Sequence, residues 1–586
     1  MCFLFFDFEV FKYDWLMVAI EPGTREETVI VNDPDRMKSF FESKKEHLWC
    51  GYNVRGYDQF ILKSILCDFN PKEVNDWIIK EKKSGWRFSD LFRKVHMTIY
   101  DVMTSEHSLK QLEAFMGHDI RETSVPFDID RKLTTEEIRQ EIIYCRHDVE
   151  ETINVFLERY NEFDSHRLLI KTFKRPKYEY GKTQAQLVAS ILGATKREYN
   201  DEFDIVIPDT LRLEKYAYVA NWYRRAKDRC TESMVKEGLD PNDYETFKKR
   251  FYEQKLVTKI AGVPHIFAWG GLHGAKPKYV DEGYYILSDV ASLYPSLMIL
   301  YNYFSRSIRN PKKYIEIYNT NLEMKKTKDP HRPAYKLVCN KTYGCLKDKN
   351  NPLYDPLMAN NICVAGQLLL LDLIEKIEPH FELIQSNTDG ILVKLDDTDE
   401  AYDLLDSIIH EWEVRTGLKM EFSEYQRVVQ KDVNNYIILT VDGKSKGKGA
   451  YVKELDDLDN DLPIVNKAIR NYIINGVRPE ETVYGCDDLI EYQKVCKVSR
   501  KYSHAVHRGK QLPDKVLRAF ASKRSEDGIL GKVKVEGKTV EKFANTSRKT
   551  FIWNDSVLGV KVPDYLDKQY YIDMIKKRLT DFGIEV

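Results

Sequence analysis

The sequence has few of the features that would place the protein in a specialised class. Its ten cysteines form no CxxC pair and no cluster with histidine at zinc-site spacing. We therefore expect reduced, structural cysteines and no zinc or iron–sulfur module. With 90 Lys+Arg against 92 Asp+Glu, the net charge is −2. This balance excludes a uniformly basic coat for nucleic acid, so any polyanion must be met by local patches.

Targeting and membrane signals are also scarce. The apolar start, MCFLFF, has no basic n-region and reaches Asp7 at once, which predicts a buried strand and not a signal peptide. No apolar run approaches the ~18–20 residues of a membrane span, and there is no repeat or low-complexity linker. These absences favour a cytoplasmic protein without membrane contact. A chain of 586 residues is expected to form roughly three to five domains.

Three spaced motifs lie between residues 289 and 390: Asp289–Ser296 (DVASLYPS), Lys336–Gly344 (KLVCNKTYG) and Asn387–Gly390 (NTDG). Asp289 follows a strand-like run at 284–287, and Asp389 lies in a hairpin-turn signal between predicted strands 381–386 and 391–395. Two carboxylates brought together by strands can hold a pair of divalent ions.

A helical hairpin is predicted between the carboxylate motifs, with helices at 311–326 and 334–344. Lys336, Asn340 and Tyr343 share one stripe of the second helix. Residues 292–296 begin a further helix, whose free N–H groups suit phosphate oxygens. The motifs together predict nucleotidyl transfer. Other residues could contact phosphate or a closely approaching backbone: Lys325, Arg332, Gly270 and Gly271.

The N-terminal third carries a second set of carboxylates. Asp7 and Glu9 are two residues apart in a strand and project to the same side. Asp58 ends the segment GYNVRGYD, and Asp148 shares one helix face with Tyr144. These four carboxylates could hold two hard divalent ions, with Tyr144 orienting a water molecule.

This N-terminal pattern resembles the 3′–5′ proofreading exonuclease domain of DNA polymerases, which has an RNase-H-like fold. Asp7 and Glu9 match its first motif, Asn53 and Asp58 its second, and Tyr144 and Asp148 its third. Ser108-Leu109 is similar to the segment of that family that holds the single-stranded primer end.

The three central motifs resemble those of family B DNA polymerases, most closely the compact bacteriophage branch, and the resemblance covers nearly the whole chain. It implies that Asp289 and Asp389, with Val290, bind two Mg²⁺ ions, which Mn²⁺ could replace. It also implies that Lys336 contacts the triphosphate and that Tyr294 lies under the sugar and excludes a 2′-OH. Further nucleotide contacts are implied for Ser292, Leu293, Asn340, Tyr343, Arg332 and Lys325.

The same resemblance implies an α/β multidomain (α+β) architecture. The expected parts are an exonuclease domain at 1–165, a helical connecting region at 166–280, an antiparallel-sheet palm at 281–300 and 345–454, helical-hairpin fingers at 301–344 and a mostly helical thumb at 455–586. No room is expected for a further N-terminal domain.

Residues 491–550 contain 16 Lys/Arg against 6 Asp/Glu. In the thumb of a polymerase such a patch contacts DNA without reading its sequence. The implied partners are primer–template DNA, dNTPs and replisome proteins such as a helicase, a clamp and a single-strand-binding protein, in an infected bacterial cell. A monomer is expected. Implied DNA-contacting residues are Asn53, Ser108, Leu109, Gly270, Gly271, Lys431, Tyr436, Lys446 and Lys448.

Three positions depart from the family pattern. Asn387 replaces the first Asp of the usual Asp-Thr-Asp turn, Gln367 replaces an arginine, and Asn434 replaces a lysine that holds the primer strand. They leave two alternatives open, a nuclease with a degraded polymerase half and an inactive DNA-binding scaffold. A reverse transcriptase is disfavoured because its Tyr-x-Asp-Asp turn is absent. The short gaps between motifs predict ordinary priming, modest processivity and no strand displacement.

Overall fold

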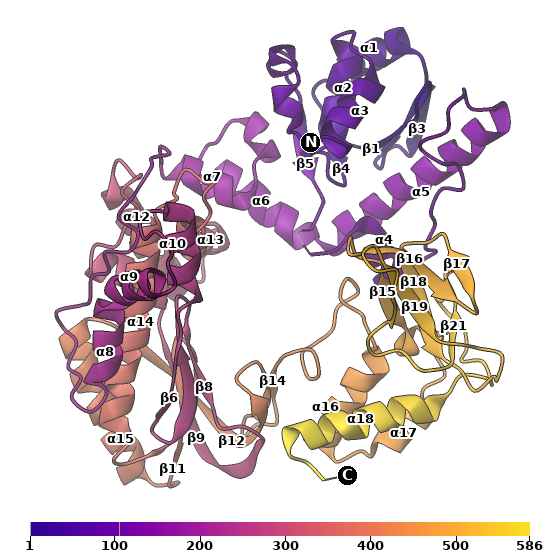
Figure 1. Ribbon diagram of the computed structural model, residues 1–586. Helices are drawn as coiled ribbons and strands as arrows, with labels where there is room; N and C mark the ends of the chain where they lie inside the picture. Colours follow the sequence, from indigo (N-terminus) through magenta and orange to yellow (C-terminus); the bar gives the residue numbers. More distant parts are fainter. Residues whose placement is uncertain (1, 105, 586) are drawn as a thin grey trace. The chain divides into compact units, whose positions relative to one another are not determined.

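The computed structural model describes residues 2–104 and 106–585, which form two compact units (Figure 1). Unit 1 comprises Met1–Thr183, Leu455–Val465 and Glu480–Asp573; unit 2 comprises Gln184–Glu454, Asn466–Pro479 and Met574–Val586. Each unit combines helices with sheets, which confirms the predicted mixed α/β class. The segment 455–586, predicted as a single thumb, is divided between the units.

Unit 1 begins with a five-stranded sheet in the order β3-β2-β1-β4-β5. Its strands are β1 (Phe3–Val10), β2 (Trp15–Glu21), β3 (Glu26–Val31), β4 (Leu48–Gly51) and β5 (Thr98–Asp101). β1 pairs antiparallel with β2 and parallel with β4. The accompanying helices are α1 (Pro34–Ser43), α2 (Asp58–Leu66), α3 (Pro71–Ile79), α4 (Leu109–Met116), α5 (Thr135–Glu158) and α6 (Tyr160–Thr172).

Alternation along β1 decides which side chains face which helices. Its even-numbered residues pack into a buried cluster with residues of α1, α2 and α3. The odd-numbered Phe3 and Phe5 instead contact Phe156 of α5, with ring centroids 5.4 and 5.2 Å apart. Because successive strand residues point to opposite faces, Asp7 and Glu9 lie on the α5 side of the sheet, as predicted.

The C-terminal part of unit 1 consists largely of strands, so the prediction of a mostly helical thumb is wrong there. A three-stranded sheet contains β15 (Lys494–Lys497), β18 (Val516–Ala521) and β21 (Thr550–Ile552), and a four-stranded sheet contains β17 (Lys510–Leu512), β16 (Tyr502–His507), β19 (Leu530–Lys534) and β20 (Val540–Lys542). The helices of segment 455–586 are α16 (Pro463–Asn475), α17 (Pro479–Gly485) and α18 (Lys568–Phe582). Arg508 and Gly509, with φ of 51° and 70°, form the two-residue turn between β16 and β17. Such a turn is a hairpin signal. The hairpin was not predicted because the segment was interpreted only from its many basic residues.

A buried arginine joins these strands to the N-terminal part of unit 1. Arg518 of β18 is fully buried, and burial lowers its pKa to about 10. Its guanidinium donates to the carbonyl oxygens of Ala114 and His118, at the end of α4, over 3.0 and 2.8 Å. It also donates to Asp555 O over 2.8 Å and to Gln493 Oε1 over 2.9 Å. The arginine therefore fixes α4 to the C-terminal sheet.

We expect Arg518→Met to destabilise the protein by at least about 3 kcal/mol, because several buried carbonyl oxygens would lose their donor. Urea unfolding, compared with wild type and with the exposed Arg548→Met as control, measures the loss. An unchanged unfolding midpoint in Arg518→Met would contradict this role.

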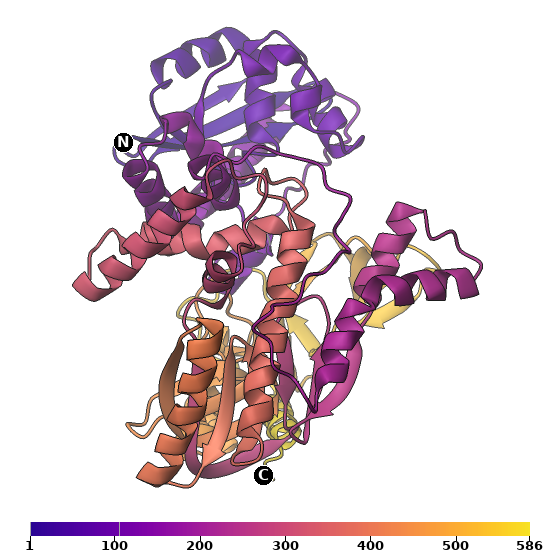
Figure 2. The ribbon, with the colours of Figure 1, turned by 90° about the vertical axis from the view of Figure 1, so that its left-hand side faces the viewer.

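Unit 2 is built on a nine-stranded antiparallel sheet in the order β14-β13-β12-β9-β11-β10-β8-β7-β6. Its strands are β6 (Leu256–Ile260), β7 (Val263–Phe267), β8 (Leu272–Ala275), β9 (Tyr279–Val290), β10 (Glu382–Thr388), β11 (Gly390–Leu395), β12 (Met420–Asp432), β13 (Asn435–Leu439) and β14 (Ser445–Lys448). Helices α14 (Pro356–Ile377) and α15 (Asp399–Thr416) lie side by side along it (Figure 2).

The predicted helical connecting region is only partly helical. It contains α7 (Gln184–Ile191), α8 (Ala217–Arg224), α9 (Ala226–Lys236) and α10 (Tyr244–Glu253). Residues 256–275 instead form β6, β7 and β8 of the large sheet, so the helical prediction is wrong for them. β6 and β7 pair from Leu256 with Phe267 to Ile260 with Val263, around a turn at Ala261 and Gly262 that was not recognised in the sequence.

The predicted helical hairpin is present as α12 (Pro311–Thr327) and α13 (Arg332–Leu346), which pack against each other. Asn310 caps α12 by accepting from the Lys312 N–H, and Pro311 occupies the first turn, where no N–H is needed. The short helix α11 (Leu293–Leu300) precedes the hairpin. The local sequence signals were sufficient to predict these three elements.

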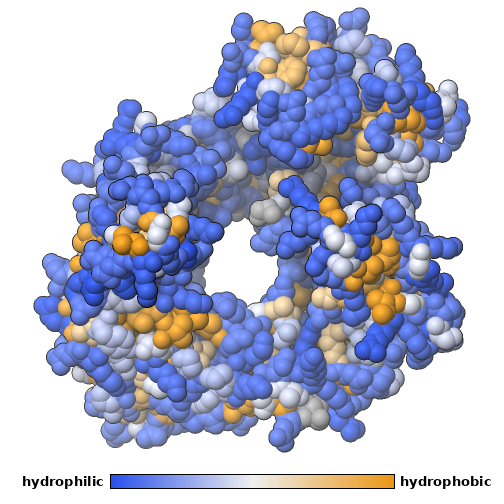
Figure 3. All heavy atoms as spheres, viewed as in Figure 1, coloured by the Kyte–Doolittle hydropathy of each residue, from blue (hydrophilic) through white to orange (hydrophobic). Residues whose placement is uncertain are grey.

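One helix among the described residues, α14, is long and apolar enough to cross a membrane by length and composition. The expectation that no apolar run approaches that length is therefore wrong. However, 94% of its most apolar window is buried inside the protein, as in the core helix of a globular domain. On the face drawn in Figure 3, hydrophobic residues form separate patches in a mostly hydrophilic surface.

Candidate active sites

The pairing of β9 with β11 brings two carboxylates of unit 2 together. Asp289 lies opposite Gly390, and the Val290 N–H donates to the Asp389 carbonyl oxygen over 2.7 Å. A Cβ atom at Gly390 would come within 1.9 Å of Asp289 Oδ1, so a side chain there would displace the Asp289 carboxylate. Thr388, with φ of 64°, makes the tight turn that precedes Asp389.

The electrostatics of this carboxylate pair suit a cation. Burial raises the pKa of both Asp289 and Asp389, and Lys446 partly offsets the increase. Among the described residues, no side chain donates a hydrogen bond to either carboxylate. Their oxygen lone pairs are therefore available to hard metal ions, and such a charge would relieve the cost of burial.

A cavity of about 350 Å³ adjoins the carboxylate pair, and predicted DNA-contacting residues line it. Lys446 and Lys448 of β14 enter the lining beside Tyr436, and Lys448 Nζ lies 3.3 Å from Asn387 Oδ1. Lys431 is elsewhere, with its Nζ 5.4 Å from the centroid of the Tyr451 ring. Two of the three predicted lysines thus adjoin the carboxylates.

The predicted nucleotide-binding residues meet on α11 and α13. The rings of Tyr294 and Tyr343 stack with centroids 3.9 Å apart and an interplanar angle of 20°. Lys336 and Asn340 are exposed on α13, and Ser292 occupies the N-cap position of α11 in the left-handed conformation, without a side-chain capping bond. The exposed side chains of Lys336 and Asn340 therefore lie on the same helix as Tyr343, whose ring stacks on that of Tyr294.

Three other predicted nucleotide contacts have different surroundings. The side chain of Leu293 is buried against α14, near Gly366. Lys325 pairs with Glu421, which lies opposite Asp289 in the sheet. Arg332 keeps a buried Nε without a hydrogen-bond partner among the described residues. Phosphate binding by Lys325 would require breaking its ion pair.

The departures from the family pattern have clear partners. Asn387 Nδ2 donates to Val433 O over 3.2 Å, and the Asn434 N–H donates to Asp432 Oδ1 over 2.9 Å. Gln367 is buried and donates to Gly270 O over 2.9 Å. These residues stabilise turns around the site.

The N-terminal carboxylate cluster consists of Asp7, Glu9, Asp58 and Asp148. Burial raises the pKa of Asp7 to about 7 and that of Asp148 to about 6, with the charge of Asp148 adding to the rise at Asp7. Burial also raises the pKa values of Glu9 and Asp58, with Asp7 as the main charged neighbour. The structure therefore brings together all four predicted carboxylates.

Two observations indicate that this cluster fits a metal. Asp58 Oδ1 is buried without a hydrogen-bond partner among the described residues. Ligand atoms of Asp7, Glu9 and Cys145 lie within 4.8 Å of one another. A buried carboxylate oxygen without a donor is costly unless a cation or water satisfies it.

A lysine that sequence reasoning did not place in the site lies inside this cluster. Lys110 of α4 forms ion pairs with Asp148 at 2.5 Å and with Glu113 at 3.0 Å. Its Nζ also lies 4.8 Å from the centroid of the Tyr144 ring. Burial opposes its charge, but the two carboxylates raise the pKa of Lys110 above its ordinary value. Its position directly after Ser108-Leu109 was the available signal.

The predicted primer-holding residues surround the cluster. Asn53, with φ of 68°, donates its N–H to the buried Asp101, which orders the loop leading to Asp58. Ser108 forms the capping box of α4, and the Leu109 side chain is buried. Contact of DNA with Leu109 would therefore involve its backbone.

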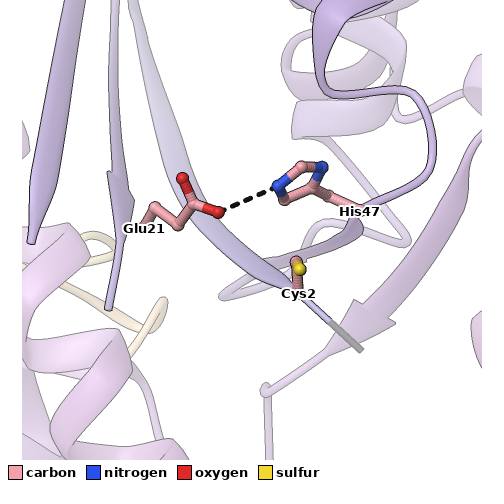
Figure 4. A group of neighbouring side chains, drawn as sticks. All are labelled: Cys2, Glu21 and His47. Atoms are coloured by element: carbon pink, nitrogen blue, oxygen red, sulfur yellow. Dashed lines mark hydrogen bonds and ion pairs between the residues drawn. The ribbon is translucent and has the colours of Figure 1, made fainter. Parts of the chain in front are cut away.

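A separate group of possible ligands lies at the other end of the strands. Cys2, Glu21 and His47 approach one another, and Figure 4 shows Glu21 directed towards His47. Glu21 accepts from Lys44 over 2.9 Å and lies 2.9 Å from His47, and these bonds lower its pKa. The Glu21 carboxylate is therefore already neutralised by Lys44.

Comparison with known proteins places these sites in context. No family model matches the chain. The DNA polymerase alpha catalytic subunit of Oryza sativa is 26% identical over 171 residues, 28% of this chain and 11% of that protein. DNA polymerase 1 of Sulfolobus acidocaldarius is 24% identical over 279 residues, 41% of this chain and 31% of that protein. The predicted resemblance to DNA polymerases is confirmed.

The matches to these DNA polymerases are partial, since they span between 11% and 31% of the curated relatives' length. A solved family B DNA polymerase, from the archaeon Pyrobaculum calidifontis, covers 99% of this chain at 14% identity with a TM-score of 0.42, and 77% of its own chain is covered. The phage-type branch stays a prediction.

Proposed function

We propose that the protein is a DNA-templated DNA polymerase that extends a primer 3′-OH with dNTPs. The observation that carries the proposal is the pairing of β9 with β11, which brings Asp289 and Asp389 together beside a lysine-lined cavity. Helices α11 and α13 supply the stacked rings of Tyr294 and Tyr343, and α13 also carries the exposed Lys336.

In this mechanism Asp289 and Asp389, with the carbonyl oxygen of Val290, would hold two Mg²⁺ ions, or Mn²⁺ in their place. When bound, these ions would supply positive charge that stabilises an in-line displacement at the α-phosphate. Lys336, supported by Arg332, binds the triphosphate, and Tyr294 under the sugar excludes a 2′-OH. Lys446 and Lys448 neutralise phosphates of the primer strand.

The N-terminal cluster is proposed to remove nucleotides from the primer 3′ end. Asp7, Glu9, Asp58 and Asp148 would hold two metal ions for hydrolysis. Tyr144 orients the attacking water through its phenol, whose pKa burial raises so that it keeps its proton. Support comes from the convergence of four buried or half-buried carboxylates near the middle of α5.

The proposed setting is phage genome replication in the cytoplasm of an infected bacterium. The protein acts there as a monomer on primer–template DNA, with a helicase, clamp or single-strand-binding protein as possible partners. The basic segment 491–550 binds DNA phosphates, so affinity for DNA should fall steeply with salt.

A gel assay with a 5′-labelled primer–template and Mg²⁺, with and without dNTPs, tests both activities. Extension with dNTPs and shortening without them would support the proposal. Shortening in both lanes would favour a nuclease with a degraded polymerase half. Binding of DNA without either reaction would favour the inactive scaffold.

Lys336→Ala is expected to raise the KM for dNTPs by about 10-fold or more, because a charged hydrogen bond to phosphate is lost. Steady-state single-nucleotide extension measures it, with the exposed Lys341→Ala on the same helix as the matched control. Equal KM values for the two variants would contradict the triphosphate role of Lys336.

Metal-dependent stabilisation of the N-terminal cluster should increase with pH. The folded-state pKa values of Asp7 and Asp148, about 7 and about 6, exceed the ordinary 3.8. The folded protein therefore binds more protons than the unfolded chain. The stabilisation that comes from this proton uptake is lost as the pH rises from about 4 to about 7. Ionised carboxylates bind metal, so the Tm gain from Mg²⁺ should be larger at pH 8 than at pH 5.

Thermal unfolding of an Asp289→Asn/Asp389→Asn background isolates this effect from the other carboxylates. Adding Asp7→Asn and Asp148→Asn to this background should remove the pH dependence of the Tm increase that Mg²⁺ causes. An equal gain from Mg²⁺ at both pH values would count against metal binding by the cluster.

A further inference from the structure

A small hydrogen-bond cluster joins three parts of unit 2 behind the proposed nucleotide-binding face. Tyr343 Oη of α13 lies 2.8 Å from Cys363 Sγ of α14. Lys347, at the end of α13, donates to the same sulfur over 3.3 Å and to Trp269 O over 3.1 Å. Trp269 lies in the turn between β7 and β8. The contacts therefore connect the helical hairpin, the core helix and this glycine-containing turn.

The turn after Trp269 also reaches the carboxylate pair. Gln367, one helical turn after Cys363, donates to Gly270 O over 2.9 Å and to Ala268 O over 2.8 Å. A Cβ atom at Gly271 would come within 2.9 Å of Thr388 Oγ1, so the backbone of this turn packs directly on Thr388. The residue after Thr388 is Asp389. Movement of the turn would therefore be transmitted to the proposed catalytic carboxylate.

At its other end the cluster determines the position of an aromatic ring. Tyr343 is held by Cys363 and stacks on Tyr294, which the proposed function places under the sugar. Burial raises the pKa of the Tyr343 phenol, so its proton stays in place to be shared with the sulfur. Without the Cys363 contact, the Tyr343 ring would lose the bond that fixes its tilt against Tyr294.

We propose that Cys363 and Lys347 are positioning residues for nucleotide selection. They attach the end of α13 to α14 and to the turn at 268–271, and they thereby hold Tyr343 against Tyr294. Neither residue contacts the substrate. This inference rests on the proposed polymerase function and adds to it a determinant of sugar discrimination outside the nucleotide pocket.

Cys363→Ala is expected to raise the KM for dNTPs by about 2- to 10-fold, the factor for one lost hydrogen bond, and to leave kcat within about 2-fold. It should also lower the preference for dNTPs over rNTPs by about the same factor, because the ring of Tyr294 gains freedom. Cys363→Ser, which keeps a hydrogen-bonding group, should restore most of the preference. Lys347→Ala should behave like Cys363→Ala.

Single-nucleotide extension with dNTPs and rNTPs tests these expectations. Cys345→Ala is the matched control for a buried cysteine, since Cys345 lies on α13 and its sulfur contacts Ala185 O. The exposed Lys349→Ala is the control for charge. Wild-type sugar discrimination in both Cys363→Ala and Lys347→Ala would overturn the inference.

Hydrogen–deuterium exchange tests the same contacts without relying on catalysis. Amides at 268–271 and 343–347 should exchange faster in Cys363→Ala and Lys347→Ala than in the controls. Unchanged exchange in both segments would overturn the inference even if the polymerase is active. Failure of the wild-type protein to extend any primer would instead overturn the proposed function.

Discussion

Asp389→Ala should abolish primer extension, with a loss of at least about 10³-fold, and leave shortening of the primer unchanged. Asp389 follows β10 directly, and its backbone is bonded to Val290 beside Asp289. Removing one of two carboxylates withdraws several kcal/mol of transition-state stabilisation by the metals, which corresponds to about this factor. The measurement is single-turnover extension with excess enzyme.

The exposed Asp397→Ala, just beyond β11, is the matched control and should extend normally. Asn387→Asp is a second useful variant, because it restores the first carboxylate of the Asp-Thr-Asp turn of the family pattern. Its side chain would lose the bond to Val433 O but gain a closer attraction to Lys448. Rapid extension by Asp389→Ala would exclude the proposed role of the carboxylate pair.

Asp58→Asn should reduce primer shortening by at least about 10³-fold without reducing extension, for the same reason of lost metal binding. Unlike most buried substitutions, this change should not lower stability in the absence of metal. Burial and the charge of Asp7 already disfavour the Asp58 carboxylate, and its Oδ1 has no donor among the described residues. Removing the charge removes this cost.

Shortening assays and thermal unfolding in EDTA measure the two effects. Asp68→Asn serves as control, because Asp68 is an exposed residue paired with Lys38 just after α2. Shortening at the wild-type rate in Asp58→Asn would contradict the nuclease site. A large drop in Tm in EDTA would show that Asp58 has a structural role instead.

The elements predicted correctly from sequence have strong local signals. Alternation along β1 placed Asp7 and Glu9 on one face, and the Asp-Gly turn placed Asp389 between two strands. The second helix of the hairpin was expected to carry the polar stripe of Lys336, Asn340 and Tyr343, and α13 contains all three residues. In each case the deciding residues lie within about ten positions of one another, the range in which periodicity and turn chemistry act.

Several of the features that were missed depend on distant residues. Strand β8 is stabilised by pairing with β10, more than 100 positions later, as in the pairing of Ser386 with Gly274. The contact between Lys347 and Cys363, and that between Arg518 and α4, leave no periodic trace in the sequence. A single side chain that bonds to a backbone carbonyl can lie on any element, so only the folded structure reveals it.

The bond between Arg518 and the end of α4 has a consequence for synthesis of the chain. Arg518 leaves the ribosome 400 residues after His118, to which it donates. At roughly 5–20 residues per second, this interval lasts about 20–80 s. During that time α4, which carries Lys110 into the N-terminal carboxylate cluster, lacks its supporting sheet. The segment Gln184–Glu454 of unit 2, which holds Asp289 and Asp389, emerges in between. The proposed nuclease site would therefore become complete later than the proposed polymerase site, although its residues are made first.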